Sequence, residues 1–419
     1  MNDFTKKEII NPEENSNWSI VEQVLREGAR KMLQTAIEKE VSAFIEKNKH
    51  NTDTKGYRLA VRNGYKPERD ILTGIGPIKI KQPRVDDRKL RKINNEQAFT
   101  SEILPRFLRR VPSIDNLIPV LYLKGISTGD FSTALSSILG DGVKNLSANT
   151  IVRLKEGWEA EYKDWSKRDL SNKKYVYFWV DGIYFNVRLE ESGPCMLVII
   201  AADQEGNKEF LAVSDGERES TLSWKELLLD LKMRGLKEYP KLAIGDGALG
   251  FWAALHEVYP ETKGQRCWVH KTANILDKLP KNIQSRAKTI IHEMYMADKK
   301  ESALLSFEKF IKLYEDKYPK AVACLVKDKE QLFTFYDFPA ANWTHIRTTN
   351  VIESTFATVR LRTYKTKGCC SRTTTLTMVY KLGIESQKNW KKIKGNKEIS
   401  LVMNGVKFID GILANKDAA

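Results

Sequence analysis

The sequence predicts an α/β fold for the second half of the chain, and two patterns support this prediction. Between residues 173 and 270, apolar runs of strand length alternate with amphipathic runs of helix length, in the order β-β-β-α-β-α-β. Residues 271–338 then carry helical, charged patterns without strands. The chain before residue 173 is mostly helical and includes one small β unit. We therefore expect an α/β core, a helical segment after it and a separate N-terminal region.

The N-terminal region is expected to begin with a long helix and continue with a short β unit. Residues 1–52 form a helical segment, because apolar side chains recur at helical spacing from 17 to 48. Residues 53–100 form a small basic β unit, since apolar residues alternate on both sides of the break at Gly76-Pro77.

Residues 101–172 are predicted to be helical again. The stretch LIPVLYLKGISTGDFSTALSSILG is typical of two helices joined by a glycine-containing turn, with the second helix capped at Ser127 or Thr128. A further helix follows Ser147. Such a pattern suits a helix-turn-helix DNA-binding domain as well as an ordinary helix pair, and the sequence leaves both open.

The charge of the chain indicates the kind of partner it meets. Lys and Arg number 69 against 54 Asp and Glu, which gives a formal net charge of +15. A surplus of this size points to a polyanion, most simply nucleic acid, although it also serves solubility. The basic side chains of the β unit form either a phosphate-contacting arm or a solvated sheet edge. The candidates are Arg62, Lys66, Lys79, Lys81 and Arg84.

Within residues 173–270 each run can be assigned to an element. KKYVYFWVDGIYFNVRLE is either two strands around an Asp-Gly turn or one long strand bent there. CMLVIIAAD, KEFLAVS, KLAIGDG and QRCWVH are predicted strands. STLSWKELLLDLKMRGLK and ALGFWAALHEVYP are predicted helices, the first capped at Ser223. The rest of the chain comprises the helical segment 271–341, a last strong helix with a basic extension over 342–390, and a tail, 391–419.

Three carboxylates stand out by their placement. Asp181 follows the apolar run YVYFWV, Asp246 ends the strand LAI, and Glu353 lies in the first turn of a helix. Each Asp-Gly pair is also typical of a plain turn. If the first and fourth strands are neighbours, however, the two aspartates lie close together and repel each other unless cations bridge them. Such oxygen ligands suit two Mg²⁺ or Mn²⁺ ions and phosphoryl transfer.

Glu353 is the candidate for the third metal-binding carboxylate. It also fits a capping box in which Asn350 is the N-cap, and that alternative needs no metal. Two arginines favour the functional interpretation, because Arg347 lies just before the helix and Arg360 lies seven residues after Glu353 on the same face. They are arranged to hold DNA phosphates beside the metal. The basic stretch RLRTYKTKG adds the phosphate-contacting candidates Arg362, Lys365 and Lys367.

Cys267 and His270 form a Cys-x-x-His pair at the end of a predicted strand. A structural zinc site needs four ligands, and the other histidines form no second matching pair. We therefore favour packing of Cys267 over zinc, with His270 either hydrogen-bonded near the acids or in contact with DNA. The five cysteines are odd in number and scattered, which is typical of a reducing compartment. Without a transmembrane run or an apolar signal region, we expect a cytoplasmic protein.

Taken together, these motifs resemble the Mutator-type DDE transposases of bacterial insertion sequences. The matching segments lie in order over residues 20–390. They are RNGYKPERDILTGIGPIKIKQPRV, LYLKGISTGDFSTALSSILG, VDGIYFNVR, IGDGALGFWAAL, CWVHKTANI and WTHIRTTNVIESTFATVRLRT. The long gap between Asp246 and Glu353 matches the family's helical insertion. Phe356 is one departure, because a polar residue is expected at that position.

The resemblance implies a ribonuclease-H-like catalytic core interrupted by an all-α insertion, with two Mg²⁺ or Mn²⁺ ions held by Asp181, Asp246 and Glu353. It implies supporting positions for Cys267, His270 and Asn350. The implied activity is metal-dependent DNA cleavage at the element's ends, followed by joining to target DNA. The N-terminal region is implied to bind the terminal inverted repeats. We expect double-stranded DNA and further copies of the chain, in a homodimer or larger homo-oligomer, as partners, no membrane, and association with the nucleoid when DNA is bound.

Three alternatives remain open on the sequence. One is a domesticated, non-catalytic DNA-binding protein derived from a transposase. Another is a nuclease that uses the same core without joining DNA, and the last is a zinc-dependent regulator built around the Cys-x-x-His pair. All three acids are present, so the sequence gives no reason to prefer the non-catalytic alternative.

Overall fold

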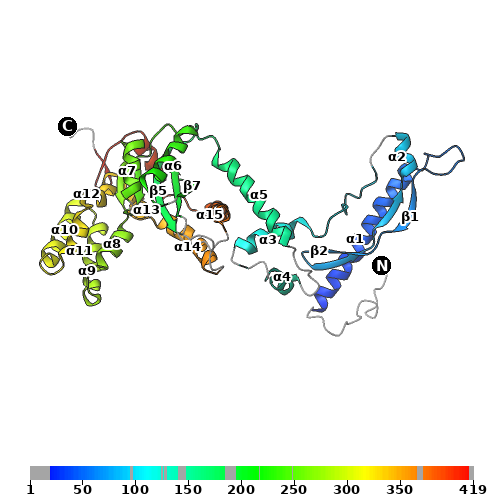
Figure 1. Cartoon of the computed structure of the whole chain (residues 1–419), viewed down its shortest axis with the longest axis horizontal. Helices are drawn as coiled ribbons and strands as arrows, with labels where there is room; N and C mark the ends of the chain where they lie inside the picture. Colours follow the sequence, from blue (N-terminus) through cyan, green and yellow to red (C-terminus); the bar gives the residue numbers. More distant parts are fainter. Residues whose placement is uncertain are drawn as a thin grey trace. The chain divides into compact units, whose positions relative to one another are not determined.

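A computed structural model of the chain describes residues 19–94, 98–123, 126, 130–139, 148–184, 195–216, 218–247, 249–365 and 371–414. These residues fall into two compact units, divided after residue 152 within a long helix, α5 (Ala148–Ser166) (Figure 1). None of the described helices combines the length and the apolar composition that crossing a bilayer requires.

The first unit combines one long helix with short strands. Helix α1 (Ile20–Lys47) begins with a capping box, in which Ser19 and Glu22 bond each other's backbone N–H groups. It packs on two antiparallel strand pairs, so the structure confirms the predicted helix and β unit. The pairs are β1 (Val61–Tyr65) with β4 (Pro83–Asp86) and β2 (Arg69–Thr73) with β3 (Gly76–Ile80). A small apolar core joins α1 to the β2–β3 pair, made of Ile37, Ile71, Ile78, Ile80 and Leu104.

Three short helices complete the first unit, α2 (Arg88–Asn94), α3 (Pro112–Leu123) and α4 (Phe131–Leu139). Ile114 of α3 packs against Leu135 and Leu139 of α4, as expected for a helix pair. The predicted caps, Ser127 and Thr128, lie outside the described residues. Helix α5 begins directly after Ser147, as predicted.

A five-stranded mixed sheet forms the centre of the second unit, which confirms the predicted α/β class. Its spatial order is β7-β6-β5-β8-β9, in which the first three strands are antiparallel and β8 and β9 run parallel to β5. The strands are β5 (Tyr175–Tyr184), β6 (Cys195–Asp203), β7 (Lys208–Gly216), β8 (Leu242–Gly245) and β9 (Lys263–Arg266).

Strand β5 runs straight through the first Asp-Gly pair. Asp181 pairs with Val198 and Gly182 with Leu197 on β6, so the alternative of two strands around a tight turn is wrong. One other local prediction is corrected. Ser220, not Ser223, caps α6 (Thr221–Met233), and its hydroxyl accepts a hydrogen bond from the Ser223 N–H at 3.1 Å.

Helices cover both faces of the sheet. On one face, α6 and α7 (Leu249–Val258) bury leucines and alanines against the side chains of Phe178, Val180 and Ile199. On the other face, α14 (Asn350–Lys365) contacts β5 and α15 (Arg372–Gln387) contacts β7. Gly383 permits the closest approach there, because a Cβ on it would lie 2.7 Å from the Phe210 ring.

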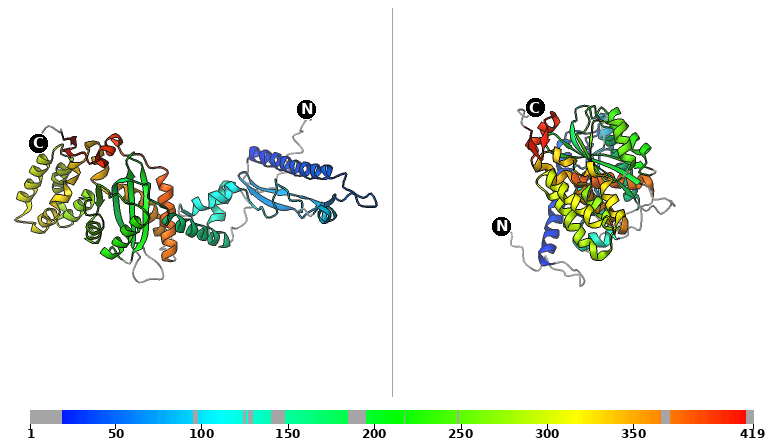
Figure 2. Two further views of the ribbon diagram at one scale, coloured as in Figure 1. Left: turned by 90° about the horizontal axis from the view of Figure 1, so that it is seen from above. Right: turned by 90° about the vertical axis from the view of Figure 1, so that its left-hand side faces the viewer.

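The segment between β9 and α14 is helical, as predicted. Its helices lie together beside the sheet (Figure 2). They are α8 (Trp268–Leu276), α9 (Lys281–Met296), α10 (Lys300–Tyr314), α11 (Pro319–Val326), α12 (Lys329–Leu332), η1 (Thr334–Asp337), η2 (Ala340–Asn342) and α13 (Trp343–Ile346). The last strong helix, α14, begins at Asn350, just after Arg347, as expected, and residues 347–349 separate it from the short helix α13. After α15 come α16 (Asn396–Met403) and a hairpin, β10 (Phe408–Ile409) and β11 (Ile412–Leu413).

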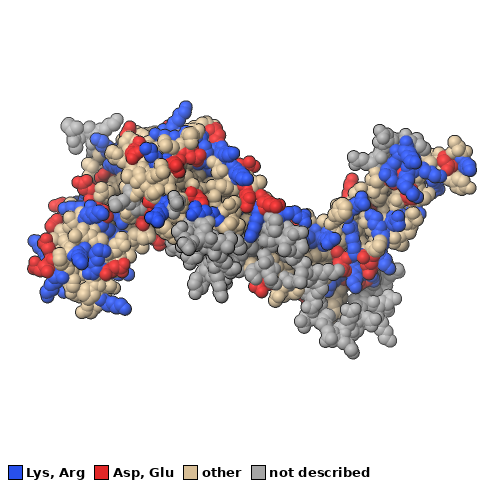
Figure 3. All heavy atoms as spheres, in the orientation of Figure 1, with Lys and Arg blue, Asp and Glu red and all other residues tan. Residues whose placement is uncertain are grey.

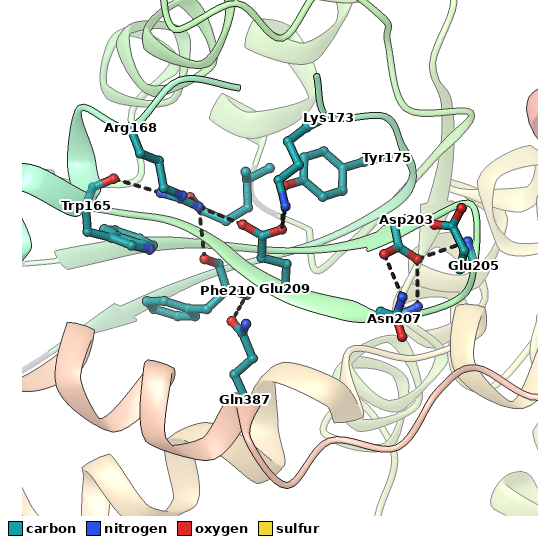
Figure 4. A network of polar contacts seen from close by, with 11 residues as sticks. Trp165, Arg168, Lys173, Tyr175, Asp203, Glu205, Asn207, Glu209, Phe210 and Gln387 are labelled. Atoms are coloured by element: carbon teal, nitrogen blue, oxygen red, sulfur yellow. Dashed lines mark hydrogen bonds and ion pairs between the residues drawn. The ribbon is translucent and has the colours of Figure 1, made fainter. Parts of the chain in front are cut away.

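A polar network ties the edge strand β7 to its surroundings (Figure 4). The Glu209 carboxylate accepts hydrogen bonds from Lys173 and Tyr175, both at 2.8 Å, and from Arg168 at 3.2 Å. The side-chain oxygen of Gln387, on α15, accepts a hydrogen bond from the Phe210 N–H at 2.7 Å. These contacts provide partners for a charged side chain and a backbone N–H group of the edge strand β7. An edge strand with unpaired backbone groups is open to pairing with a strand of another chain.

Candidate active site

Asp181 and Asp246 lie at the same level on neighbouring parallel strands. Trp179 of β5 is in register with Ile244 of β8, and each aspartate lies two residues further along its strand direction. Because neighbouring strands are about 4.8 Å apart, this register brings the backbone of Asp181 close to that of Asp246, the residue that follows β8. Asp181 is only 7% exposed, and the Asp246 carbonyl accepts a hydrogen bond from the Trp252 indole at 3.0 Å.

The same face of β5 anchors the segment that leads into α14. Side chains alternate along a strand, so Asp181 shares a face with Tyr177 and Trp179. The Tyr177 hydroxyl donates to Asn342 Oδ1 at 2.8 Å, and the Trp179 indole donates to the His345 carbonyl at 2.9 Å. Both bonds fix the chain just before α14 on the face where Asp181 lies.

Glu353 lies in a small polar cluster with Cys267, His270 and Thr349. His270 Nε2 is 3.7 Å from Glu353 Oε1. The Thr349 hydroxyl lies 3.2 Å from Cys267 Sγ, 3.3 Å from His270 Nδ1 and 3.4 Å from Glu353 Oε1. Thr349 therefore joins the Cys-x-x-His pair to the third acid.

Two predictions about this cluster are corrected. Asn350 is the first residue of α14, and the Thr349 carbonyl accepts the hydrogen bond from the Glu353 N–H, so the capping box with Asn350 as N-cap is wrong. Strand β9 ends at Arg266, and α8 begins right after Cys267. His270 therefore lies in the first turn of a helix and not on a strand.

Electrostatic contacts connect His270 to all three acids. The hydrogen bond to Cys267 and the negative charges of Asp181 and Asp246 together raise the pKa of His270 to about 9, against the opposing effect of burial. Burial raises the pKa of the Cys267 thiol, but hydrogen bonds with His270 and Thr349 outweigh burial and lower it overall. An imidazolium at this position carries positive charge between Glu353 and the aspartates.

The structure adds a fourth carboxylate, Glu219, that the sequence patterns do not single out. Glu219 lies between β7 and α6, directly before the helix cap. Burial, together with repulsion from Asp246 and Asp181, raises the pKa of its carboxyl to about 7. Nothing in the local sequence distinguishes this glutamate from its neighbours, because its place depends on contacts between distant segments.

The donor chemistry of the site fits divalent cations. Asp181 and Asp246 concentrate enough negative charge to disfavour ionisation of Glu219, which is the effect that a bound cation relieves. Carboxylate oxygens are the ligands that Mg²⁺ and Mn²⁺ prefer. Among the described residues, Cys267, His270 and Glu353 bring three ligand atoms within 4.8 Å of one another, one short of a structural zinc site.

Arg347 does not lie where the sequence pattern suggests. Its guanidinium donates to the carbonyls of Trp343 and Tyr295, and it lies between the rings of Tyr295 and Phe335. It is 9% exposed, so its described contacts stabilise the packing of the helical segment.

The side chains of the other basic candidates near Glu353 lie outside the part of the chain that the structure describes. Lys367 is outside the described residues, as are the side chains of Arg360, Arg362 and Lys365.

Basic side chains gather on the first unit. Burial lowers the pKa of Lys66, and repulsion from Arg69, Arg106 and Arg84 lowers it further, so these four cations lie near one another. Figure 3 shows Lys and Arg side chains across the described surface of this unit. The remaining candidates are exposed as well. Lys79 and Lys81 extend from the β3 edge, and Arg62 pairs with Glu38 at 3.7 Å.

A buried ion cluster supports the strand that precedes Cys267. Asp328 Oδ2 lies 2.6 Å from Lys271 Nζ and 3.1 Å from Arg266 Nε, and the two cations are 2% and 6% exposed. With Gly247 and Trp252 these residues line a cavity of about 450 Å³. A Cβ on Gly247 would lie 2.0 Å from Arg266 Nη2, so this glycine gives the guanidinium room beside Asp246.

Asp328→Asn should therefore destabilise the second unit. The substitution leaves two buried cations without their carboxylate, at a cost of about 3 kcal/mol in the free energy of unfolding. Urea denaturation followed by tryptophan fluorescence measures it. Asp337→Asn is the matched control, because its pair with Lys263 is largely exposed and is worth less than about 1 kcal/mol. Equal losses in the two variants would contradict the interpretation.

Comparison with known proteins identifies the family. The family model described as "Transposase, Mutator family" matches residues 4–393. The chain is 50% identical to the transposase for insertion sequence element IST2 of Acidithiobacillus ferrooxidans, over 67% of this chain and 95% of that one. It is 47% identical to the transposase for IS6120 of Mycolicibacterium smegmatis, over 72% and 93%. The chain therefore belongs to the Mutator family of transposases.

Proposed function

We propose that the chain binds the terminal inverted repeats of an insertion sequence, cleaves DNA at those ends and joins them to target DNA. Asp181, Asp246 and Glu353 are the proposed ligands of two Mg²⁺ or Mn²⁺ ions. The register between β5 and β8 is the observation that carries this proposal, because it sets the two aspartates level at one sheet edge. His270 supplies the link to Glu353.

The proposed core is ribonuclease-H-like. Its parts are the five-stranded sheet with α6 and α7 on one face and α14 on the other, and the helices between β9 and α14 form the proposed insertion. The order of the strands, three antiparallel followed by two parallel, supports this assignment. The insertion helices also have a role at the site, since Asp328 holds Lys271 and Arg266 beside the Cys267 cluster.

Divalent ions at such a site would activate water or a 3′-hydroxyl and stabilise the leaving oxygen. The chain itself positions the acids. Backbone pairing fixes Asp181, and the indole of Trp252 holds the loop at Asp246. His270 and Thr349 hold the Glu353 carboxylate. No side chain in this arrangement needs to form a covalent intermediate with DNA.

DNA binding is assigned to basic side chains of the first unit. Lys66, Arg69, Arg84 and Arg106 repel one another in the free protein, and binding to phosphates would relieve that repulsion. Because two element ends must be handled together, we further propose a homodimer or larger homo-oligomer.

A strand-transfer assay tests this function. The purified full-length chain is incubated with labelled ends of its own element, target plasmid and Mg²⁺ or Mn²⁺. We expect nicked ends and covalently joined product, both abolished by a chelator. Nicks without joined product would favour the nuclease alternative. Binding of the ends without any metal-dependent cleavage would favour a non-catalytic DNA-binding protein, and either result would contradict the proposal.

A further inference from the structure

Glu219 lies in a space that two glycines leave open for it. A Cβ on Gly182 would lie 1.9 Å from Glu219 Oε1, so the carboxylate occupies the position of a missing side chain directly after Asp181. A Cβ on Gly250 would lie 2.4 Å from the Glu219 carbonyl. The two contacts bring the segment before α6 against both β5 and the start of α7.

These contacts place Glu219 at the sheet edge from the side opposite to Glu353. Gly182 shares the face of Phe178 and Val180, which α6 and α7 cover, whereas Asp181 shares the face on which α14 lies. The aspartate pair is thus flanked by Glu219 on one side and by Glu353 on the other. Among the charged groups that act on Glu219, Asp246 and Asp181 raise its pKa and His270 lowers it.

We propose that Glu219 is a fourth carboxylate of the divalent-ion site, where it binds metal together with Asp181 and Asp246. This inference rests on the proposed function. Two ions bring four positive charges, and the three expected carboxylates neutralise only three of them. A fourth carboxylate on the far side of the aspartate pair supplies the missing charge.

Isothermal titration calorimetry of Mn²⁺ binding to the full-length chain tests the role of Glu219 without a catalytic readout. Glu219→Gln should weaken Mn²⁺ binding about tenfold or more. Glu226→Gln, an exposed glutamate on α6, is the matched control and should bind Mn²⁺ like the parent protein. Because the Gln variant lacks the repulsion from Asp181 and Asp246, it should melt at the same temperature as the parent or higher.

Gly182 offers a second variant that leaves every carboxylate in place. Gly182→Ala should also weaken Mn²⁺ binding, because the new methyl group displaces the Glu219 carboxylate. In the Glu219→Ala variant there is no carboxylate for the new methyl group to displace. Adding Gly182→Ala to that variant should therefore change the Mn²⁺ affinity little further. If the two substitutions instead lowered the Mn²⁺ affinity independently and additively, the contact between Gly182 and the Glu219 carboxylate would have no role in ion binding.

Asp181→Asn separates this inference from the proposed function. If Asp181→Asn weakens Mn²⁺ binding and Glu219→Gln does not, Glu219 is not a ligand and the proposed function stands. If neither substitution changes Mn²⁺ affinity, the ion site itself is wrong and both proposals fail. Loss of affinity in both variants, with the Glu226 control unchanged, is the expected result.

Discussion

Asp181→Asn is expected to abolish cleavage of the element ends while leaving their binding nearly unchanged. The carboxylate is 7% exposed at the sheet edge, level with Asp246, and an amide of the same shape preserves its packing. Loss of one member of a catalytic unit should lower the cleavage rate by on the order of 10⁴-fold. DNA binding should persist, because it is assigned to cations of the other unit. Single-turnover cleavage and a mobility-shift assay measure the two effects.

Asp316→Asn is the control for this experiment, because Asp316 is an exposed aspartate of the same unit far from β5 in sequence. It should cleave at the parent rate. Metal-dependent cleavage by Asp181→Asn at more than a small fraction of that rate would refute the assignment. Loss of binding together with cleavage would instead show that the substitution unfolds the chain, which a thermal melt detects.

The spacing of the two aspartates shows how much of the site the sequence could predict. Each acid follows an apolar run, and runs of this kind are reliable signs of buried strands. Which strands are neighbours is not encoded locally, so the sequence predicts the alignment of Asp181 with Asp246 only if their strands are neighbours, as β5 and β8 are in the structure. The glycine after each aspartate is typical of a turn in sequence. In the structure Gly182 instead leaves space for the Glu219 carboxylate, and Gly247 leaves space for the Arg266 guanidinium.

Short apolar runs explain the local errors. In QRCWVH the alternation over a few residues fits a strand and the first turn of a helix equally well, and the helix begins after Cys267. Arg347 shows a second limit of prediction from sequence. A cation close to an acid in the sequence is expected to contact DNA phosphates, but the Arg347 guanidinium contacts two backbone carbonyls and two aromatic rings of the helical segment. Phe356, the residue that departs from the expected polar type, is fully buried and so belongs to the core.

Glu219 and Thr349 were missed for a common physical reason. Each gains its place from contacts between segments far apart in the chain, the loop before α6 with Gly182 and the residue before α14 with Cys267. No periodicity or motif spacing records such contacts. The sequence can therefore predict the elements and the acids that follow their apolar runs. The groups that orient those acids are brought together only when the sheet and its helices assemble.

Replacing His270 should give the second large effect, through the orientation of Glu353. Its imidazole contacts Cys267 and Thr349 and lies 3.7 Å from Glu353 Oε1, so we assign it as a positioning residue for that carboxylate. His270→Gln should lower cleavage by about 10- to 100-fold, the usual cost of removing a partner of a metal ligand. His256→Gln, an exposed histidine on α7, should cleave normally.

The pH profile distinguishes positioning by a charged imidazole from simple packing. The pKa of His270 is raised to about 9, above the usual value, so the ring is protonated at neutral pH and loses its charge as the pH rises through 9. Cleavage by the parent protein should therefore decline on the alkaline side. His270→Lys should move that decline to higher pH, because lysine keeps its proton longer, and His270→Gln should lack it. Three superimposable profiles would mean that the charge on His270 has no role, and the ring would then be a packing residue for Thr349 alone.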